Sequence, residues 1–201
     1  MIPVSRKAEP VNFDADVRRP GLNYLASTTS PNFKRNRYWS NAATELNYAY
    51  NKICAYSCFY LASPGSVDHF LPKVKHPQLA YEWNNYRLAH PRVNSRKGDS
   101  EEIIDPFVVQ DGWFTIDFPS CLVMAGAGLP DLITGQINKT ISILGLNDDD
   151  FLVQERCDIM MSFAEGELAL TFLQRRWPFL AAEIVRQGIE MSARDIFKKR
   201  T

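Results

Sequence analysis

Apolar side chains recur every three to four residues along much of the chain, which is the spacing of an amphipathic helix. The pattern predicts a helix over residues 129–144, then one long helix or two shorter ones over 151–177. Pro178 can start a further helical segment. In the first half the same spacing predicts a helix over residues 39–60, which ends before the turn residues 63–66.

Two short apolar runs in the first half have the length and the bounding turn residues of strands. Residues 67–71 and 85–89 are expected to form a small hairpin. The segment from Asn94 to Lys97 is expected to begin or occupy a helix. The resulting order is strand, strand, helix.

A second hairpin is expected beyond residue 100. The apolar runs 107–109 and 113–118 are joined by Asp111-Gly112, a dipeptide typical of hairpin turns. Short strands together with several long helices predict the α+β class, with a small ββα unit in a mainly helical domain and an additional β-hairpin.

The start of the chain is rich in proline, which argues for an extended arm over residues 1–35 rather than a helix. Arg18-Arg19 and the run 34–37 make this arm basic, so it either contacts a nucleic-acid backbone or is simply solvated. The expected division is an arm over 1–38, a core with its preceding helix over 39–100, and a hairpin plus helices over 101–201, packed with the core as one domain. The last four residues are expected to fray.

The composition is that of an ordinary globular protein, with 201 residues, 45% hydrophobic and 23% charged. The net charge is zero, but it is unevenly distributed. Residues 1–98 carry 14 Lys and Arg against 6 Asp and Glu, a net of +8, and residues 99–201 carry 9 against 17, a net of −8. A basic half suits phosphate binding. The alternative is that the two halves neutralise each other in the fold.

The four cysteines have no spacing that indicates a disulfide framework, so we expect reduced thiols and a cytoplasmic protein. No apolar signal core and no stretch of membrane-spanning length is apparent, so no membrane partner is expected.

Candidate chemistry is concentrated around Asp68-His69, Asn85 and Asn94. A carboxylate is the oxygen ligand that a hard divalent cation prefers, and a neutral imidazole suits proton abstraction near neutral pH. Adjacent residues of a strand point to opposite faces, so both reach one site only where the strand ends or bends. Asn85 and Asn94 follow at an interval of nine residues.

At these positions the chain resembles the HNH endonucleases, the His-Me finger or ββα-metal class. Their pattern is Asp-His on the first strand, Asn before an aromatic or apolar residue on the second, and His or Asn nine residues later in the helix. The resemblance is closest to HNH proteins of the Septu and retron anti-phage systems. The matching segments are Cys54-Ala55-Tyr56, Val67–Lys73 and Tyr81–Leu88.

The resemblance implies a role for each of these residues. His69 would be the general base that activates water, and Asp68 and Asn94 would hold one Mg²⁺ or Mn²⁺ ion. Asn85 would brace the loop and orient the His ring. The charge and proximity of five basic residues make them candidate phosphate contacts: Lys73, Lys75, Arg87, Arg96 and Lys97.

The chain departs from many of these relatives at the positions of a structural zinc. Instead of two Cys-x-x-Cys pairs it has Cys54 with Ser57 and His90 with Val93, so no structural zinc is predicted. Packing of Trp83, Tyr86 and Phe59 is expected to replace it. A site formed by Cys54, Cys58 and His90 is the alternative.

The expected activity is therefore metal-dependent hydrolysis of phosphodiester bonds in DNA. By resemblance the chain would be a defence effector that works with a separate ATPase subunit. From its charge balance of −8, the acidic half would be either a docking surface for that partner or a cover that restrains the nuclease. Two alternatives stay open: an endonuclease toxin that cleaves RNA such as tRNA, and a non-catalytic nucleic-acid-binding or adaptor protein.

Overall fold

A computed structural model of the chain describes residues 1–197, and it divides them into two compact units. The unit that carries the candidate residues comprises residues 5–55 and 61–101 and is called the N-terminal unit below. The C-terminal unit comprises residues 1–4, 56–60 and the chain from Glu102 onward. The expected fraying of the last four residues lies outside the described part of the chain.

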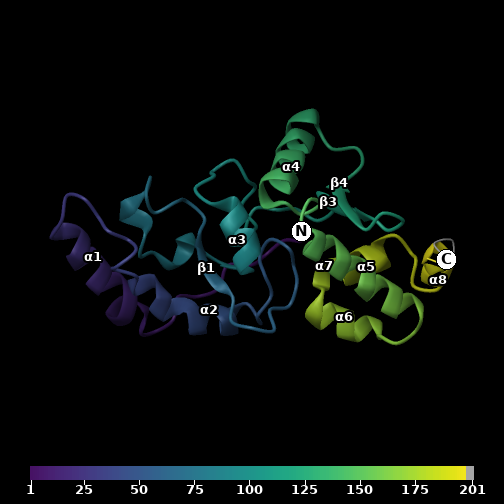
Figure 1. The fold of residues 1–201 in the computed structure, drawn as a ribbon, viewed down its shortest axis with the longest axis horizontal. Coiled ribbons are helices and arrows are strands. Elements are labelled where there is room, and N and C mark those ends of the chain that lie inside the picture. The colour runs from purple at the N-terminus through teal and green to yellow at the C-terminus, as the bar shows by residue number, and fades with distance from the viewer. Residues whose placement is uncertain (198–201) are drawn as a thin grey trace. The chain divides into compact units, whose positions relative to one another are not determined.

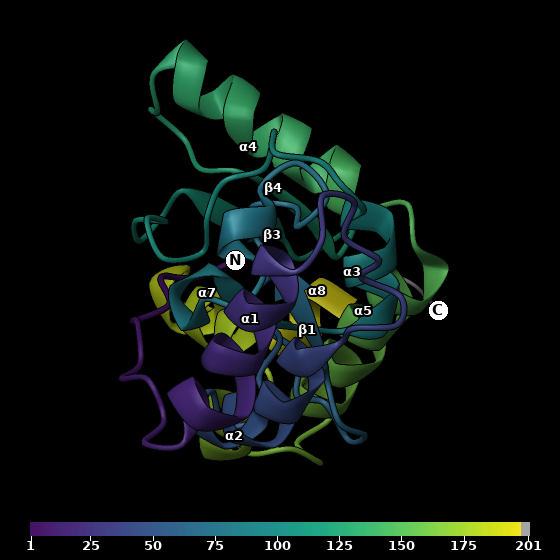
Figure 2. The ribbon, with the colours of Figure 1, turned by 90° about the vertical axis from the view of Figure 1, so that its left-hand side faces the viewer.

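The N-terminal unit combines short helices with one small antiparallel sheet (Figure 1). Its elements are a π-helical turn Asp14–Arg18, α1 Arg19–Ala26, a 3₁₀ turn Tyr38–Ala42, α2 Ala43–Ala49, β1 Ser66–His69, 3₁₀ turns Pro77–Leu79 and Trp83–Asn85, β2 Tyr86–Ala89 and α3 Pro91–Lys97. Figure 2 shows α1, α2 and β1 from a second direction.

The expectation of an extended arm over residues 1–35 is wrong, because Asp14 to Ala26 is helical. Pro20 is the second residue of α1, which continues directly from the π-helical turn Asp14–Arg18. Gly21 lies against the ring of Tyr81, and a Cβ atom there would meet Cγ of Tyr81 at 2.2 Å. The absence of a side chain at Gly21 therefore lets this helix pack closely against Tyr81.

The helix expected over residues 39–60 is much shorter. It begins as the 3₁₀ turn at Tyr38 and ends with α2 at Ala49. Asn51 and Lys52 both have positive φ, at 51° and 56°, a conformation that ends a right-handed helix. Helix propensities are assigned residue by residue, so they do not predict two consecutive residues with positive φ.

The expected order of strand, strand and helix is present in the N-terminal unit. β1 pairs with β2 in antiparallel register, with Asp68 opposite Arg87 and His69 opposite Tyr86. α3 follows directly, and the Nδ1 atom of His90 caps it by accepting a hydrogen bond from the backbone N–H of Arg92 at 3.2 Å. The helix ends before Gly98, whose φ is +52°.

An aromatic cluster supports the back of this hairpin. The ring of Phe13 packs edge-on against Trp83 and Tyr86, at centroid distances of 5.6 and 5.8 Å. Packing of Trp83 and Tyr86 at this position was expected. The ring that packs against both of them within this unit is Phe13, which belongs to the segment predicted to be an extended arm. Phe59, the expected third member, belongs to the C-terminal unit.

The C-terminal unit is mainly helical and contains the second hairpin. Its elements are β3 Phe114–Asp117, β4 Leu122–Ala125, α4 Asp131–Leu144, α5 Asp150–Ala164, α6 Leu170–Arg176, α7 Pro178–Arg186 and α8 Ala193–Phe197. The prediction for residues 151–177 resolves into two helices, and Pro178 starts α7 as expected.

The second hairpin contains one strand of the two expected: β3 lies within the predicted run 113–118, whereas its partner strand and the turn are formed by other residues. β3 pairs with β4, so the connecting turn lies between Asp117 and Leu122, and Asp111-Gly112 precedes the first strand. The carboxylate of Asp117 accepts a hydrogen bond from the backbone N–H of Ser120 at 3.0 Å and stabilises this turn. The α+β class is confirmed, with two small antiparallel hairpins among the described helices.

Two further observations concern the whole described chain. Among the described residues, none of the four cysteines is joined to another in a disulfide bond. None of the helices in residues 1–197 has the length and apolar character needed to cross a membrane.

Candidate functional site

Asp68 and His69 meet at a small polar cavity at the end of β1. The cavity has a volume of about 60 Å³, and Lys73, Asn94 and Asp99 also line it. Both residues line the cavity at the point where β1 ends, which is where adjacent strand residues can share one site. The structure thus brings together Asp68, His69, Lys73 and Asn94, four of the residues that the sequence singled out.

His69 is buried and held in one orientation. Its Nε2 atom lies 2.8 Å from the carbonyl oxygen of Ala80. A carbonyl oxygen only accepts hydrogen bonds, so Nε2 carries the proton, and Nδ1 of the neutral ring keeps a lone pair. Trp39 and Tyr86 pack edge-on against the ring at 5.1 and 5.2 Å. These contacts fix both the tautomer and the direction of the ring.

The environment of His69 favours its neutral form. Burial, together with the positive charges of Lys73 and Lys97, lowers the pKa of His69 from 6.5 to about 3, against the opposing hydrogen bond to Ala80. The ring is therefore unprotonated at neutral pH, which is the state a general base needs. An anion brought into the cavity would favour the charged ring and raise this pKa.

The low pKa of His69 predicts a loss of stability between pH 7 and pH 5. In the unfolded chain His69 takes up a proton near pH 6.5, whereas in the folded chain it does so only near pH 3. Between these values the unfolded state binds more protons, so the free energy of unfolding falls as the pH falls, by about 2 kcal/mol at pH 5. We expect urea unfolding curves to show this loss in the wild type and not in His69→Gln. A His90→Gln control that also removes the pH dependence would contradict the assignment.

Asn85 acts on the loop after β1 and not on the cavity itself. Its Oδ1 atom accepts a hydrogen bond from the backbone N–H of Leu71 at 2.8 Å, and its Nδ2 atom donates to the carbonyls of Leu71 and Leu79 at 2.9 and 3.1 Å. Leu79 precedes Ala80, whose carbonyl holds His69. Asn85 is therefore placed to position the His ring through the backbone.

Tyr86 also contributes to this arrangement. Its hydroxyl donates a hydrogen bond to the same Ala80 carbonyl at 2.9 Å, and burial raises the pKa of the phenol, so the hydroxyl keeps its proton. The Ala80 oxygen is thus held from two sides.

Asp68 forms a buried ion pair with Lys97. The Nζ atom of Lys97 lies 3.0 Å from Oδ1 of Asp68 and 2.8 Å from the carbonyl oxygen of His69, and both side chains are almost fully buried. The expectation that Lys97 contacts phosphate is therefore wrong for this structure. The ammonium group instead fixes the Asp68 carboxylate against the end of β1.

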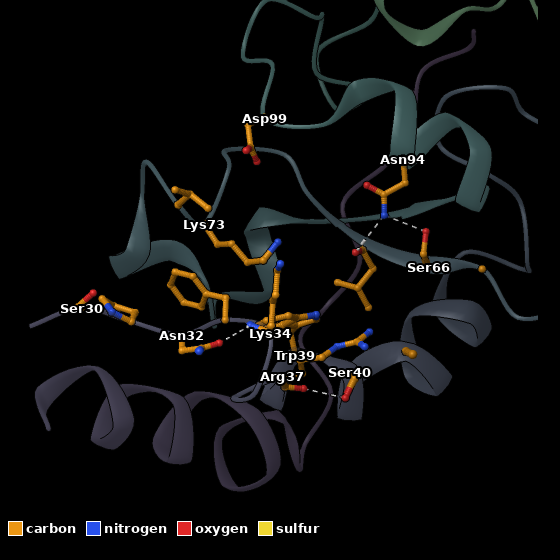
Figure 3. Close-up of a pocket in the computed structure, with 16 residues that line it drawn as sticks. Ser30, Asn32, Lys34, Arg37, Trp39, Ser40, Ser66, Lys73, Asn94 and Asp99 are labelled. Carbon is orange, nitrogen blue, oxygen red and sulfur yellow. Dashed lines mark hydrogen bonds between the residues drawn. The ribbon is translucent and has the colours of Figure 1, made fainter. Parts of the chain in front are cut away.

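Asn94 presents an amide oxygen to the open side of the site. Its side chain approaches the hydroxyl of Ser66 at 2.9 Å and the carbonyl oxygen of Val67 at 3.4 Å. A carbonyl accepts only, so the amide nitrogen faces Val67 and Oδ1 faces away, as Figure 3 shows. Within residues 1–197 this oxygen has no hydrogen-bond donor, so it is available to a ligand.

Two oxygen ligands at this cavity fit a hard divalent cation. Asp68 offers a carboxylate and Asn94 an amide oxygen, and Mg²⁺ characteristically takes one or two protein oxygens and completes its coordination with water and phosphate. Over the described chain no three His, Cys, Asp or Glu residues are grouped so that they could hold a metal. The donor set thus suits Mg²⁺ or Mn²⁺ and lacks the ligands of a closed zinc site.

The other predicted phosphate contacts take different positions. Arg87 is 2% exposed, and its guanidinium donates to the carbonyls of Asn84 and Tyr86, so the prediction that it contacts phosphate is wrong. Its guanidinium also lies over the Phe70 ring. Lys75 is exposed but pairs with Glu101 at 3.3 Å. Arg96 is exposed on the last turn of α3 and does not line this cavity.

Lys73 lies closest to the expected role. Its Nζ atom lies 5.3 Å from the centre of the Trp39 ring, at the border of the cavity. Burial lowers the pKa of Lys73, while the carboxylates of Asp99 and Asp68 act in the opposite direction. It is the member of the predicted basic set that both lines the cavity and keeps part of its surface open to solvent.

Sequence reasoning missed four residues of the site: Trp39, Ser66, Tyr86 and Asp99. Tyr86 follows Asn85 directly, so its position in the motif was visible although its hydrogen bond was not. Ser66 precedes the apolar run of β1 and resembled an ordinary turn residue. Trp39 and Asp99 lie far from His69 along the chain, so no local pattern connects them.

No protein-family model matches the chain, and no curated protein sequence matches it significantly. The geometry of the site therefore carries the functional argument.

Proposed function

We propose that this chain is an HNH-type endonuclease that hydrolyses phosphodiester bonds in DNA with the help of one divalent metal ion. The observation that carries the proposal is the orientation of His69. The ring donates from Nε2 to the Ala80 carbonyl and keeps the lone pair of Nδ1, in a cavity that Asp68 and Asn94 share. A buried base beside two oxygen ligands is what metal-assisted hydrolysis of a phosphodiester needs.

In this proposal each residue has a distinct task. His69 accepts the proton of the attacking water, and its neutral state makes it ready to do so at neutral pH. Asp68 and Asn94 would hold Mg²⁺ or Mn²⁺, which when bound would neutralise charge on the scissile phosphate and the leaving oxygen. Lys97 keeps Asp68 in place, and Asn85 and Tyr86 keep the Ala80 carbonyl in place.

The biological role of the chain is proposed from the sequence resemblance alone. We propose a role as an effector of anti-phage defence, acting with a separate ATPase subunit. The alternatives are cleavage of RNA such as tRNA at the same site, and nucleic-acid binding without cleavage. A non-catalytic binder has no need of a base held in one tautomer beside two unlike oxygen ligands.

Metal removal tests the proposed activity. We expect the full chain to cleave DNA in the presence of Mg²⁺ or Mn²⁺ and to lose cleavage below detection in EDTA, because Asp68 and Asn94 would then hold no cation. Gel assays on matched single-stranded DNA, duplex DNA and RNA give the substrate class. Cleavage that persists unchanged in EDTA would contradict the metal site, and cleavage of RNA alone would replace DNA as the substrate.

A further inference from the structure

A larger cleft adjoins the catalytic cavity within the N-terminal unit (Figure 3). Its volume is about 970 Å³, and it shares Val67, Lys73, Asn94 and Asp99 with the small cavity. One wall consists of residues 30–34, which precede the 3₁₀ turn before α2. The other wall consists of β1, the loop after it and α3. A molecule lying in the cleft would therefore extend directly from the site of His69.

The cleft has a positive balance of charge. The basic residues that line it are Lys34, Arg37 and Lys73. Among the described residues, the acidic one that lines it is Asp99. Lys34 and Arg37 are exposed and Lys73 is half-buried, so these cations are accessible to a ligand. Figure 3 shows Lys34, Arg37 and Lys73 among the side chains that line the cleft. Cations that line one cleft attract an anion that enters it.

The loop that supplies Lys34 is held in shape by its own side chains. The Oδ1 atom of Asn32 accepts hydrogen bonds from the backbone N–H groups of Lys34 and Arg35 at 3.1 and 3.2 Å. The Tyr81 hydroxyl donates to the carbonyl of Asn36 at 2.9 Å. The Phe33 ring packs against Tyr81 at 6.4 Å. The cations of this wall are thus presented by a braced loop, which lowers the entropy cost of binding.

Trp39 links the cleft to the catalytic base. One contact of its ring is the edge-on packing with His69, at 5.1 Å, and another is Nζ of Lys73, at 5.3 Å from the ring centre. Trp39 therefore lines the larger cleft and also packs against His69, which lines the small cavity. An anion bound at Lys73 would lie next to the ring that supports His69.

We propose that this cleft binds the sugar–phosphate backbone of one nucleic-acid strand, and that Lys34, Arg37 and Lys73 contact phosphates on one side of the scissile bond. The inference rests on the proposed nuclease function and adds Lys34 and Arg37 to its substrate-binding residues. The volume lies at the upper end of the roughly 300–1,000 Å³ of small-molecule pockets, which suits a short stretch of one strand and not a whole duplex. Repeated negative charge in the ligand matches cations spread over two walls.

Binding without turnover tests the inference. The probe is a fluorescein-labelled single-stranded DNA oligonucleotide, added to the full chain carrying His69→Gln so that it is not cleaved. The test variant adds Lys34→Gln and Arg37→Gln, and the matched control adds Arg19→Gln and Arg35→Gln, which remove the same charge from exposed residues outside the cleft. We expect the test variant to bind on the order of tenfold more weakly by anisotropy, and the control to bind like the parent. Equal weakening in both, or none in the test variant, would overturn the inference.

The salt dependence gives a second readout. Each lost phosphate contact to a single strand reduces the steepness of log K against log salt by roughly 0.7. For the test variant, which loses two cations, we expect the slope to be shallower by about twice that amount. Bound oligonucleotide should also protect Lys34 and Lys73 from acetylation while leaving the exposed Lys7 reactive. Acetylation of Lys34 at an unchanged rate would overturn the inference even if the double variant folded poorly.

The outcomes separate this inference from the nuclease proposal. Binding that depends on Lys34 and Arg37 in a protein that cleaves nothing with any metal would leave the cleft assigned and remove the nuclease function. Cleavage by the wild type that is unaffected by the Lys34 and Arg37 substitutions would leave the nuclease function and remove the cleft.

Discussion

Replacing His69 by glutamine is expected to lower the rate of nucleic-acid cleavage by roughly 10²- to 10⁴-fold, the usual contribution of a positioned general base. Glutamine can still donate a hydrogen bond to the Ala80 carbonyl, so the local packing should be retained. It has no basic nitrogen to take the place of Nδ1. The loss should therefore appear in the chemical step, measured as the single-turnover rate at saturating Mg²⁺.

The matched control for this experiment is His76→Gln. His76 lies in the loop between β1 and β2, where it approaches Glu101 at 3.3 Å, and it does not line the cavity. Its replacement should leave the rate unchanged. Oligonucleotide binding by His69→Gln should match the wild type, because the residue is a base and not a phosphate contact. Equal cleavage by His69→Gln and the wild type would remove His69 from the mechanism.

Local sequence signals were sufficient to predict the two strands and the helix that carry the candidate site. Short apolar runs bounded by turn residues predicted β1 and β2, and proline and glycine at the ends of the next segment are consistent with α3. The interval between Asn85 and Asn94 then places one residue before β2 and the other on α3. These features are local, so a single sequence contains them.

The contacts of the basic residues could not be predicted from such local signals. Lys97 finds Asp68 across a separation of 29 residues, and Arg87 is buried among backbone carbonyls of its own hairpin. From the sequence both were simply cations near a phosphate-binding motif. Whether a cation faces solvent or another charge depends on packing between segments, which no spacing along one strand reveals.

The errors in secondary structure have a related origin. Asp111-Gly112 carries the strongest turn signal, yet the turn of the hairpin lies at Asp117 to Leu122, where the Asp117 side chain supplies the hydrogen bond. Pro20 was taken as a helix breaker, yet it lies within the helical segment Asp14 to Ala26. In both cases residue type alone did not decide the outcome.

Replacing Lys97 by methionine is expected to lower the free energy of unfolding by about 3–5 kcal/mol, because it removes the buried positive charge that lies 3.0 Å from the Asp68 carboxylate. Methionine keeps much of the length of the lysine chain, so the loss reflects charge more than volume. Urea unfolding in the presence of EDTA measures the effect. If Asp68 is a metal ligand, Mg²⁺ can supply the missing positive charge, and the stability of the variant should recover as Mg²⁺ is raised.

The double variant Asp68→Asn with Lys97→Met is the control for this recovery. It removes both charges, so it should be much closer to the wild type in stability than Lys97→Met alone, and Mg²⁺ should not change it. A Lys97→Met protein whose stability is independent of Mg²⁺ would contradict a metal at Asp68. A double variant as unstable as Lys97→Met would mean that lost packing, and not the loss of the positive charge beside Asp68, causes the destabilisation.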